Sequence, residues 1–220
     1  RRVGAWVEGS PTPVLSAPNA SGCLVFNPSY IPASDSSPSG LLVRQCCGES
    51  CIGHGNGDQP ERIGFAPCGL DGACDAVLPD FDLDPEADAE DPRAFLYDDG
   101  FYYNFYLRDP PANHSGCEGD QCTVQLSRTK TPLDAGSWDR VSTLPWHRNG
   151  CCLWNASDTH CLWGEGPDPF PGLGISVTHD LSEGVFEQKP RRVLPTAPFR
   201  SSSPKYDDRE ICLVSSQSLP

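Results

Sequence analysis

The fold is decided by the stretch Glu90-Asp91-Pro92-Arg93, which continues over 94–107 as AFLYDDGFYYNFYL. Two acids, a Pro and an Arg precede an apolar run, a polar turn at Asp98-Asp99-Gly100 and a second run rich in aromatic residues. Both flanks of the turn consist of β-forming residues, and Gly supplies the backbone freedom that tight hairpin turns require. The stretch therefore predicts a charged loop that leads into a β-hairpin over 94–107.

An Arg beside carboxylates at the entry to a strand is costly to bury unless the charges pair. The motif therefore indicates either a structural ion pair between Asp91 and Arg93 or a site built to handle a polar substrate.

Short β-forming segments, separated by Pro, Gly and polar residues, recur along the rest of the chain at 24–26, 41–44, 62–65, 123–127, 151–154 and 159–163. The first should end at Asn27-Pro28, because Pro has no N–H group and stops a central strand. We expect loops at 46–58, 69–89 and 109–121. No segment has a sustained apolar period of 3.6 residues, so the expected fold class is all-β with almost no helix.

Two segments, 126–139 and 175–187, repeat one pattern: a strand, a polar turn, a Gly, one further residue, a large aromatic residue and an acid. The aromatic residues, Trp138 and Phe186, lie 48 positions apart. This period suits one four-stranded blade of a β-propeller, in which every blade reuses the same turn. The repeat therefore predicts that Trp138 and Phe186 occupy equivalent places on successive blades.

The Glu-Asp-Pro-Arg motif before an aromatic-rich hairpin resembles the central motif of the five-bladed β-propeller glycosidases. It is most similar to that of the β-mannoside phosphorylases and hydrolases, glycoside hydrolase family 130. Further stretches agree in order with that family: 27–29 with 40–44, 127–139, 148–150 and 176–187.

This resemblance covers roughly 23–187. It implies a lead-in over 1–22 and a partial, disulfide-rich propeller over 23–220, with blades at about 23–68, 90–139 and 146–187 and the start of another at 205–220. Three blades cannot close a five-bladed ring. We therefore expect either further blades in a longer protein or self-association.

The resemblance gives Asp91 the role of general acid in cleaving a glycosidic bond. Glu90 beside it would disfavour its ionised form and Arg93 would favour it, so the sequence leaves the direction of its pKa open. The alternative is a structural Asp91 that pins the chain to Arg93. The substrate-binding residues that the resemblance implies are Asn27, Arg44, Glu90, Arg93, Tyr106, Arg148 and Asn149.

Inorganic phosphate is a possible co-substrate, and we expect no other cofactor and no metal. The basic residues available for phosphate are Arg44 and Arg148; a solvated or ion-paired Arg148 is the alternative. Tyr103, Tyr106 and Trp146 can stack on sugar faces or lie in the core, and we assign sugar contact to one of them at most.

Three further features have a functional and a structural interpretation. Glu165-Gly166-Pro167-Asp168 resembles the acid-bearing motif of related propeller families, but it is expected at the tip of a loop. The acidic stretch 80–88 suits a solvated loop, with calcium binding as the alternative. His54 lies between glycines, which favours an exposed residue over a metal ligand.

The formal net charge of −14 would repel phosphate backbones, so nucleic acid is an unlikely partner, whereas a neutral glycan would not be repelled. No Gly-x-Ser-x-Gly elbow and no Gly-rich phosphate loop is present. No run approaches the roughly 18 apolar residues that a membrane span needs.

The 12 Cys residues show no repeated Cys-x-x-Cys pair with His partners, which favours disulfides over metal sites. Acceptor patterns for N-glycosylation begin at Asn19, Asn113 and Asn155. The chain begins Arg1-Arg2 and contains no Met, so we expect a processed or partial piece of a longer precursor. Together these features predict a secreted or luminal glycoprotein.

The sequence thus predicts a glycoside hydrolase or phosphorylase that acts on β-mannosides or related glycans. The alternative is a non-catalytic, secreted, disulfide-rich module that uses the propeller scaffold for glycan binding or assembly. The two differ in whether a second carboxylate serves the far side of the sugar, and the sequence offers no clear candidate.

Most of the thiols should be paired. Alkylation followed by mass measurement should modify few of the 12 Cys in the native protein and most of them after reduction. Reaction of most Cys without reductant would show that the secreted assignment is wrong.

Overall fold

The computed structural model describes residues 23–34, 37–47, 61–69, 73–109, 123–144, 148–154, 159–164, 172–187 and 191–195. Within this part of the chain the structure is all-β, and its only helices are two 3-10 turns, η3 (Ala135–Ser137) and η4 (Leu181–Glu183). The expected fold class is confirmed. None of the described helices is long and apolar enough to cross a membrane.

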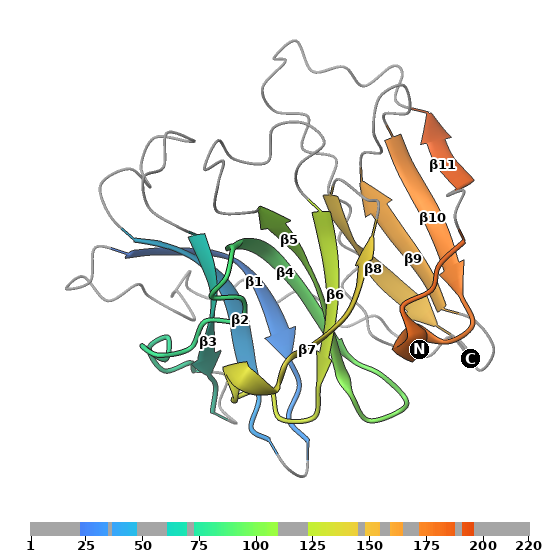
Figure 1. The fold of residues 1–220 in the computed structure, drawn as a ribbon. Coiled ribbons are helices and arrows are strands. Elements are labelled where there is room, and N and C mark those ends of the chain that lie inside the picture. The colour runs from blue at the N-terminus through green and yellow to red at the C-terminus, as the bar shows by residue number, and fades with distance from the viewer. Residues whose placement is uncertain are drawn as a thin grey trace, which may run out of the picture.

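The strands form three antiparallel sheets in chain order (Figure 1). Sheet 1 contains β1 (Cys23–Ile31), β2 (Gly40–Cys47) and β3 (Glu61–Pro67). Sheet 2 contains β4 (Asp88–Leu96), β5 (Tyr102–Asp109), β6 (Thr123–Thr129) and β7 (Asp139–Leu144). Sheet 3 contains β8 (Arg148–Trp154), β9 (Thr159–Gly164), β10 (Gly172–Thr178) and β11 (Arg191–Pro195).

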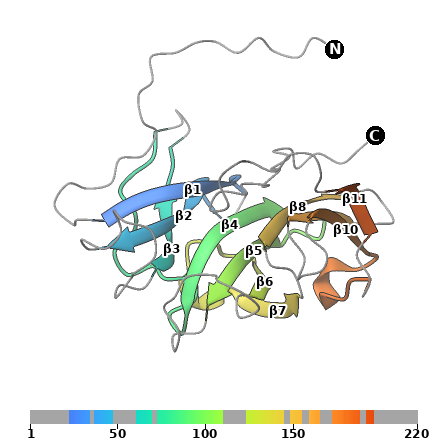
Figure 2. The same cartoon turned by 90° about the horizontal axis from the view of Figure 1, so that it is seen from above.

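Sheet 2 lies between the other two, as the view in Figure 2 shows. Its first strand, β4, contacts β1 of sheet 1 and β8 of sheet 3. Each sheet is a meander that uses neighbouring strands in order, which is the arrangement of propeller blades.

The aromatic strand β5 explains this central position of sheet 2. Successive side chains of a strand point to opposite faces. On one face Tyr102 and Tyr106 join a core shared with sheet 1, and on the other Tyr103, Phe105 and Leu107 join a core shared with sheet 3. A strand with both faces buried needs apolar side chains at nearly every position, which accounts for the aromatic run.

The predicted hairpin is confirmed, because β4 and β5 pair antiparallel around a turn in which Gly100 has a φ of 79°. The prediction that Glu90 to Arg93 form a charged loop is wrong. These residues lie within β4, where the register with β5 shifts by one residue between Glu90 and Arg93. The motif is a β-bulge inside a strand.

The expectation that the first strand ends at Asn27-Pro28 is also wrong. Strand β1 continues through both residues to Ile31, with a register shift between Phe26 and Ser29. Pro is tolerated because β1 pairs only with β2 in its sheet and because Pro28 lies in the irregularity.

The predicted repeat is confirmed. Trp138 follows η3 after the third strand of sheet 2 and packs against the core between sheets 1 and 2. Phe186 follows η4 after the third strand of sheet 3, and it packs against the core between sheets 2 and 3. Both turns begin with an Asp whose side chain accepts a hydrogen bond from the backbone N–H two residues later, Asp134 and Asp180. The aromatic residues therefore occupy equivalent places on successive sheets.

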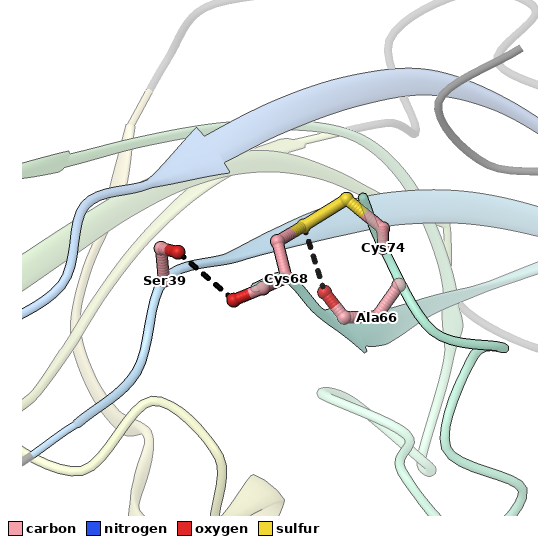
Figure 3. Close-up of a disulfide and its surroundings, with 4 residues drawn as sticks. All are labelled: Ser39, Ala66, Cys68 and Cys74. Atoms are coloured by element: carbon pink, nitrogen blue, oxygen red, sulfur yellow. Dashed lines mark hydrogen bonds between the residues drawn. A yellow bond between two sulfur atoms is a disulfide. The ribbon is translucent and has the colours of Figure 1, made fainter. Parts of the chain in front are cut away.

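Disulfides join residues that face one another across antiparallel pairs: Cys23–Cys47, Cys68–Cys74 and Cys152–Cys161. Around the second, the Ser39 hydroxyl donates to the backbone carbonyl of Cys68 at 3.1 Å, and Figure 3 shows how this fastens the end of β3 beside β2. Cys46 is also disulfide-bonded. The preference for disulfides over metal ligation is confirmed for these residues.

The acidic stretch 80–88 is not the solvated loop that its composition suggests. Phe81 and Leu83 lie in the core, and Asp84 is only 3% exposed. The Asp84 carboxylate accepts hydrogen bonds from Tyr106 at 3.0 Å, Arg108 at 2.9 Å and Arg140 at 3.2 Å. These bonds attach the segment before β4 to β5 and β7.

Several predictions fall outside the described residues. They concern the lead-in over 1–22, the blade beginning at 205–220, His54, Trp146, the motif at 165–168 and the three glycosylation patterns. The blade boundaries stay a prediction.

Phe105 tests the packing between sheets 2 and 3. It is fully buried and contacts Phe95 and Phe186, with ring centroids 6.2 and 6.4 Å apart. Phe105→Ala should lower the free energy of unfolding by about 3–5 kcal/mol in a urea titration with the disulfides intact. Val185→Ala, at a side chain that is 65% exposed, is the control and should cost little. A loss below about 1 kcal/mol for Phe105→Ala would contradict the described core.

Candidate functional site

The first strand of each sheet carries a one-residue register break. The breaks contain Asn27-Pro28 in β1, Asp91-Pro92 in β4 and Asn149-Gly150 in β8. Asn27 and Asp91 have φ angles of 49° and 51°, in the left-handed region that Asn and Asp adopt more readily than other residues with a side chain. Because β4 contacts both β1 and β8, the three strands that carry the breaks are neighbours.

Two contacts join the breaks of β1 and β4. The Asn27 side-chain amide donates to Oδ1 of Asp91. Two residues further along β1, the Ser29 hydroxyl accepts from the backbone N–H of Ala94 at 2.7 Å. The bulge thus turns Asp91 out of the ladder of sheet 2 and toward sheet 1.

Arg44 of β2 is the cation on which the acids of this region converge. Its Nη1 lies 3.0 Å from Glu90 Oε2 and 3.2 Å from Asp91 Oδ1. Its Nη2 forms an ion pair with Glu61 of β3. The guanidinium also lies over the ring of Phe26, the residue opposite Arg44 in β1, at 4.8 Å from the centroid.

Asn104 of β5 supports the bulge from the other side. It is fully buried, and its side-chain carbonyl accepts the backbone N–H of Arg93 at 2.9 Å. The bulge removes this N–H from regular pairing, and a buried N–H needs an acceptor. This explains why an amide interrupts the aromatic run of β5.

The surroundings give the two neighbouring acids, Glu90 and Asp91, different pKa values. Burial raises the pKa of Glu90 to about 8, and Glu61 and Asp91 add to this against the opposing charge of Arg44. Burial acts in the same direction on Asp91, but the charge of Arg44, the hydrogen bond from Asn27 and the charge of Arg93 together hold its pKa below the ordinary value. The pKa values of the two neighbouring carboxyls are therefore shifted in opposite directions, upward for Glu90 and downward for Asp91.

The acids in turn act on Arg44. Burial alone would lower the pKa of its guanidinium, but Glu90, Glu61 and Asp91 raise it, so Arg44 stays charged at every accessible pH.

The structure brings together five of the eight residues predicted from the sequence: Asn27, Arg44, Glu90, Asp91 and Arg93. Tyr106 lies elsewhere, in the core between sheets 1 and 2, with its hydroxyl bonded to Asp84 and only 2% of the residue exposed. The backbones of Arg148 and Asn149 lie at the register break of β8, and their side chains fall outside the description.

Glu61 belongs to the site but was missed by the sequence analysis. Arg44 stands directly opposite Ile63, and Glu61 lies two residues before Ile63 on the same face of β3. An acid at the start of a predicted strand is a weak signal, and only the register of β2 with β3 shows that it reaches Arg44.

This arrangement is suited to acid–base chemistry on a neutral polar ligand, because the two carboxyls on the same nitrogen of Arg44 have pKa values shifted in opposite directions. Among the described residues, no group of three or more His, Cys, Asp and Glu side chains has an arrangement that could hold a metal ion.

No family model matches the chain, and no curated protein matches it in sequence. Solved structures do share its fold. A family 117 glycoside hydrolase from the marine bacterium Zobellia galactanivorans has a TM-score of 0.56 at 17% identity, over 79% of this chain and 58% of the other. A family 130 glycoside hydrolase, described as targeting β-1,2 mannosidic linkages in Candida mannan, has a TM-score of 0.51 at 18% identity, over 76% and 48%.

The chain spans about half the length of these two structures. Both are propeller-type glycosidases, so the likeness shows a propeller-type arrangement of the sheets in this chain. Neither the number of blades in a closed ring nor the substrate follows from identities this low.

Arg44→Met tests whether the guanidinium neutralises the cluster. Without Arg44, buried carboxylates lose their cation, and the free energy of unfolding should fall by about 3–5 kcal/mol at pH 8. The deficit should shrink as the pH falls toward 5, because the carboxyls, whose pKa values rise when the cation is removed, then take up protons in the folded state.

Arg62→Met is the matched control. Arg62 lies in β3 opposite Gln45, the residue after Arg44, and its Nε donates to the neutral side chain of Gln45 at 3.1 Å. Its effect should be smaller, and its dependence on pH should be confined to the titration of Asp82, on whose carboxyl the charge of Arg62 acts. Urea titrations of both variants at several pH values measure the difference. Equal and pH-independent losses for the two variants would contradict the account of the cluster.

Proposed function

We propose that the chain is a carbohydrate-active protein of the glycosidase type, which acts on β-mannosides or related glycans outside the cytosol. The fold that it shares with glycoside hydrolases supports the class. The disulfides support the location, because such bonds persist in oxidising compartments.

The observation that carries the proposal is the position of Asp91. Its carboxylate leaves the strand ladder at a bulge with a positive φ, and it meets partners from two strands of sheet 1, Asn27 of β1 and Arg44 of β2. Backbone strain of this kind is stored at functional sites when the surrounding structure fixes it. We assign Asp91 as a catalytic carboxylate on this ground.

The ionised state of Asp91 bears on its role. A group whose pKa is held low keeps no proton for the leaving oxygen at neutral pH, but it stabilises positive charge at the anomeric carbon or accepts a proton from water. Asp91 therefore does not suit the acid role that the family resemblance implies for it. Another carboxyl would have to supply the proton to the leaving oxygen.

Water is the proposed acceptor rather than inorganic phosphate. Arg44, one of the two basic residues considered for phosphate, already contacts Glu61, Glu90 and Asp91. A phosphate that approached it would have to displace these acids from both terminal nitrogens of the guanidinium. We therefore favour hydrolysis over phosphorolysis.

The second candidate is a non-catalytic glycan-binding module. It is favoured by the same ion pairs, because Arg44 ties β2 to β3 and β4 in a way that would also serve a purely structural role. Under this proposal the cluster holds sheets 1 and 2 together and glycans bind elsewhere on the scaffold.

Asp91→Asn separates the two candidates. On β-mannosides that the wild-type protein hydrolyses, the rate should fall by at least ~10²-fold, and the product should be the free sugar with or without inorganic phosphate. Asp98→Asn, at the exposed turn of the same hairpin, is the control and should keep full activity. Wild-type and Asp91→Asn proteins that bind a mannan array equally and cleave nothing would establish the binding module.

A further inference from the structure

The register breaks of β1 and β4 act alike around Arg44. Consecutive side chains of a regular strand point to opposite faces, yet each break directs two consecutive side chains at one cluster. In β4, Glu90 and Asp91 both contact Arg44. In β1, the centroid of the Phe26 ring lies 4.8 Å from the guanidinium carbon of Arg44. The next residue, Asn27, donates its amide to Asp91. An aromatic ring and an amide thus join the ion pairs.

The two residues with strained backbones contact each other. Asn27 and Asp91, with φ angles of 49° and 51°, are the only residues other than Gly with a positive φ in the part of the chain that the structure describes. Their side chains are hydrogen-bonded to each other. Backbone strain of this kind clusters at binding and catalytic sites, where the surrounding structure fixes it. The break in β1 therefore belongs to the site as much as the break in β4 does, and it brings Phe26 with it.

Phe26 begins an apolar surface that continues along β1. The residue is half-buried, and Arg44 covers one face of its ring. Leu24, two positions earlier, is 42% exposed. Leu24 lies opposite Cys46, and Phe26 lies opposite Arg44, so both side chains are on the same side of sheet 1. Leu24 and Phe26 form an apolar strip, which runs from the cluster at Asp91 toward the start of β1.

The combination of this strip with the polar cluster suits a sugar. A pyranose ring presents an apolar face of C–H groups and an edge of hydroxyl groups. The apolar strip matches the face. The Asn27 amide, the Arg44 guanidinium and the Asp91 carboxylate match the edge, because hydroxyl groups both donate and accept hydrogen bonds. A few polar groups beside an apolar surface are the usual composition of a site for a small molecule.

Tyr30 is another aromatic residue of β1, and its position excludes it from this surface. It is 58% exposed, but it pairs with Leu41, which lies three positions before Arg44 in β2. Because residues an odd number of positions apart in a strand point to opposite faces, Tyr30 lies on the other side of sheet 1 from Arg44.

Resting on the proposed function, we propose that the apolar strip of Leu24 and Phe26 is a sugar subsite beside Asp91. One sugar unit packs its C–H face on Phe26, with a glycosidic linkage near Asp91, and the next unit lies over Leu24. Two residues of a strand span roughly 7 Å, so Leu24 lies beyond the sugar unit that covers Phe26. The ligand of the site is therefore a β-linked oligosaccharide rather than a single mannoside.

NMR spectroscopy of a bound ligand that resists cleavage tests the subsite. The probe is β-mannobiose with sulfur in place of the glycosidic oxygen. In the wild-type complex, the ring current of Phe26 should move C–H resonances of the sugar upfield. Phe26→Leu should abolish this shift and raise the Kd of the probe by about 3- to 10-fold, as expected for the loss of one aromatic contact. Phe26→Tyr keeps the ring and should retain both properties.

Phe101→Leu is the matched control. The Phe101 ring is also half-buried and lies 4.9 Å from the guanidinium carbon of Arg128, but it is located between β4 and β5, away from Asp91. This variant should keep the upfield shift and the Kd of the wild type, and so should Tyr30→Leu. A shift that survives in Phe26→Leu, or that disappears in Tyr30→Leu instead, would overturn the proposal.

Leu24→Ser tests the second sugar unit at an exposed position where folding should not suffer. It should weaken binding of the sulfur-linked mannobiose and leave the Kd of methyl β-mannoside unchanged, because a single sugar unit covers only Phe26. Equal effects on the two ligands, or no effect on either, would overturn the extension of the subsite over Leu24.

The subsite and the proposed function fail differently. A wild-type protein that binds the probe with the upfield shift, but cleaves no β-mannoside, overturns the hydrolytic function and retains the subsite. If the wild type cleaves β-mannobiose and Phe26→Leu does so with the same KM, the proposed function stands and the subsite is overturned. A protein that neither binds nor cleaves β-mannosides overturns both.

Discussion

The constraint on which the site depends is the charge balance around Arg44. One guanidinium faces Glu61 along its own sheet and Glu90 and Asp91 across the gap to sheet 2. Burying these groups would be costly without the cation, so Arg44 holds β2 of sheet 1 to β4 of sheet 2. The same surroundings shift the pKa values of Glu90 and Asp91 in opposite directions, and this asymmetry gives the site its proposed chemistry.

The backbone provides the second requirement. Without the register break, Glu90 and Asp91 would point to opposite faces of sheet 2, as adjacent residues of a regular strand do. The bulge, with Asp91 at a φ of 51°, lets both carboxyls reach the same nitrogen of Arg44. Asn104 stabilises the bulge by accepting the N–H that it releases. The catalytic proposal thus rests on an irregularity that the rest of the sheet holds in place.

Much of this arrangement could be predicted from the sequence. The hairpin followed from the turn at Asp98-Asp99-Gly100, and the equivalence of Trp138 and Phe186 followed from a repeated turn, because both depend on local patterns. The bulge at Asp91 could not be predicted, since a run of charged residues with a Pro is typical of loops as well as of irregular strands. Glu61 and Asp84 were not predicted as partners, because their roles depend on register and on packing between distant segments.

The central claim is that a glycan binds with its scissile bond beside Asp91. A crystal structure of the protein with a β-mannoside whose glycosidic oxygen is replaced by sulfur tests this most directly, since the sulfur resists cleavage. The account predicts the anomeric carbon of the sugar beside the Asp91 carboxylate. A sugar bound at another place, with the ion pairs of Arg44 undisturbed and closed to the ligand, would contradict the account and leave the cluster a structural tie between sheets 1 and 2.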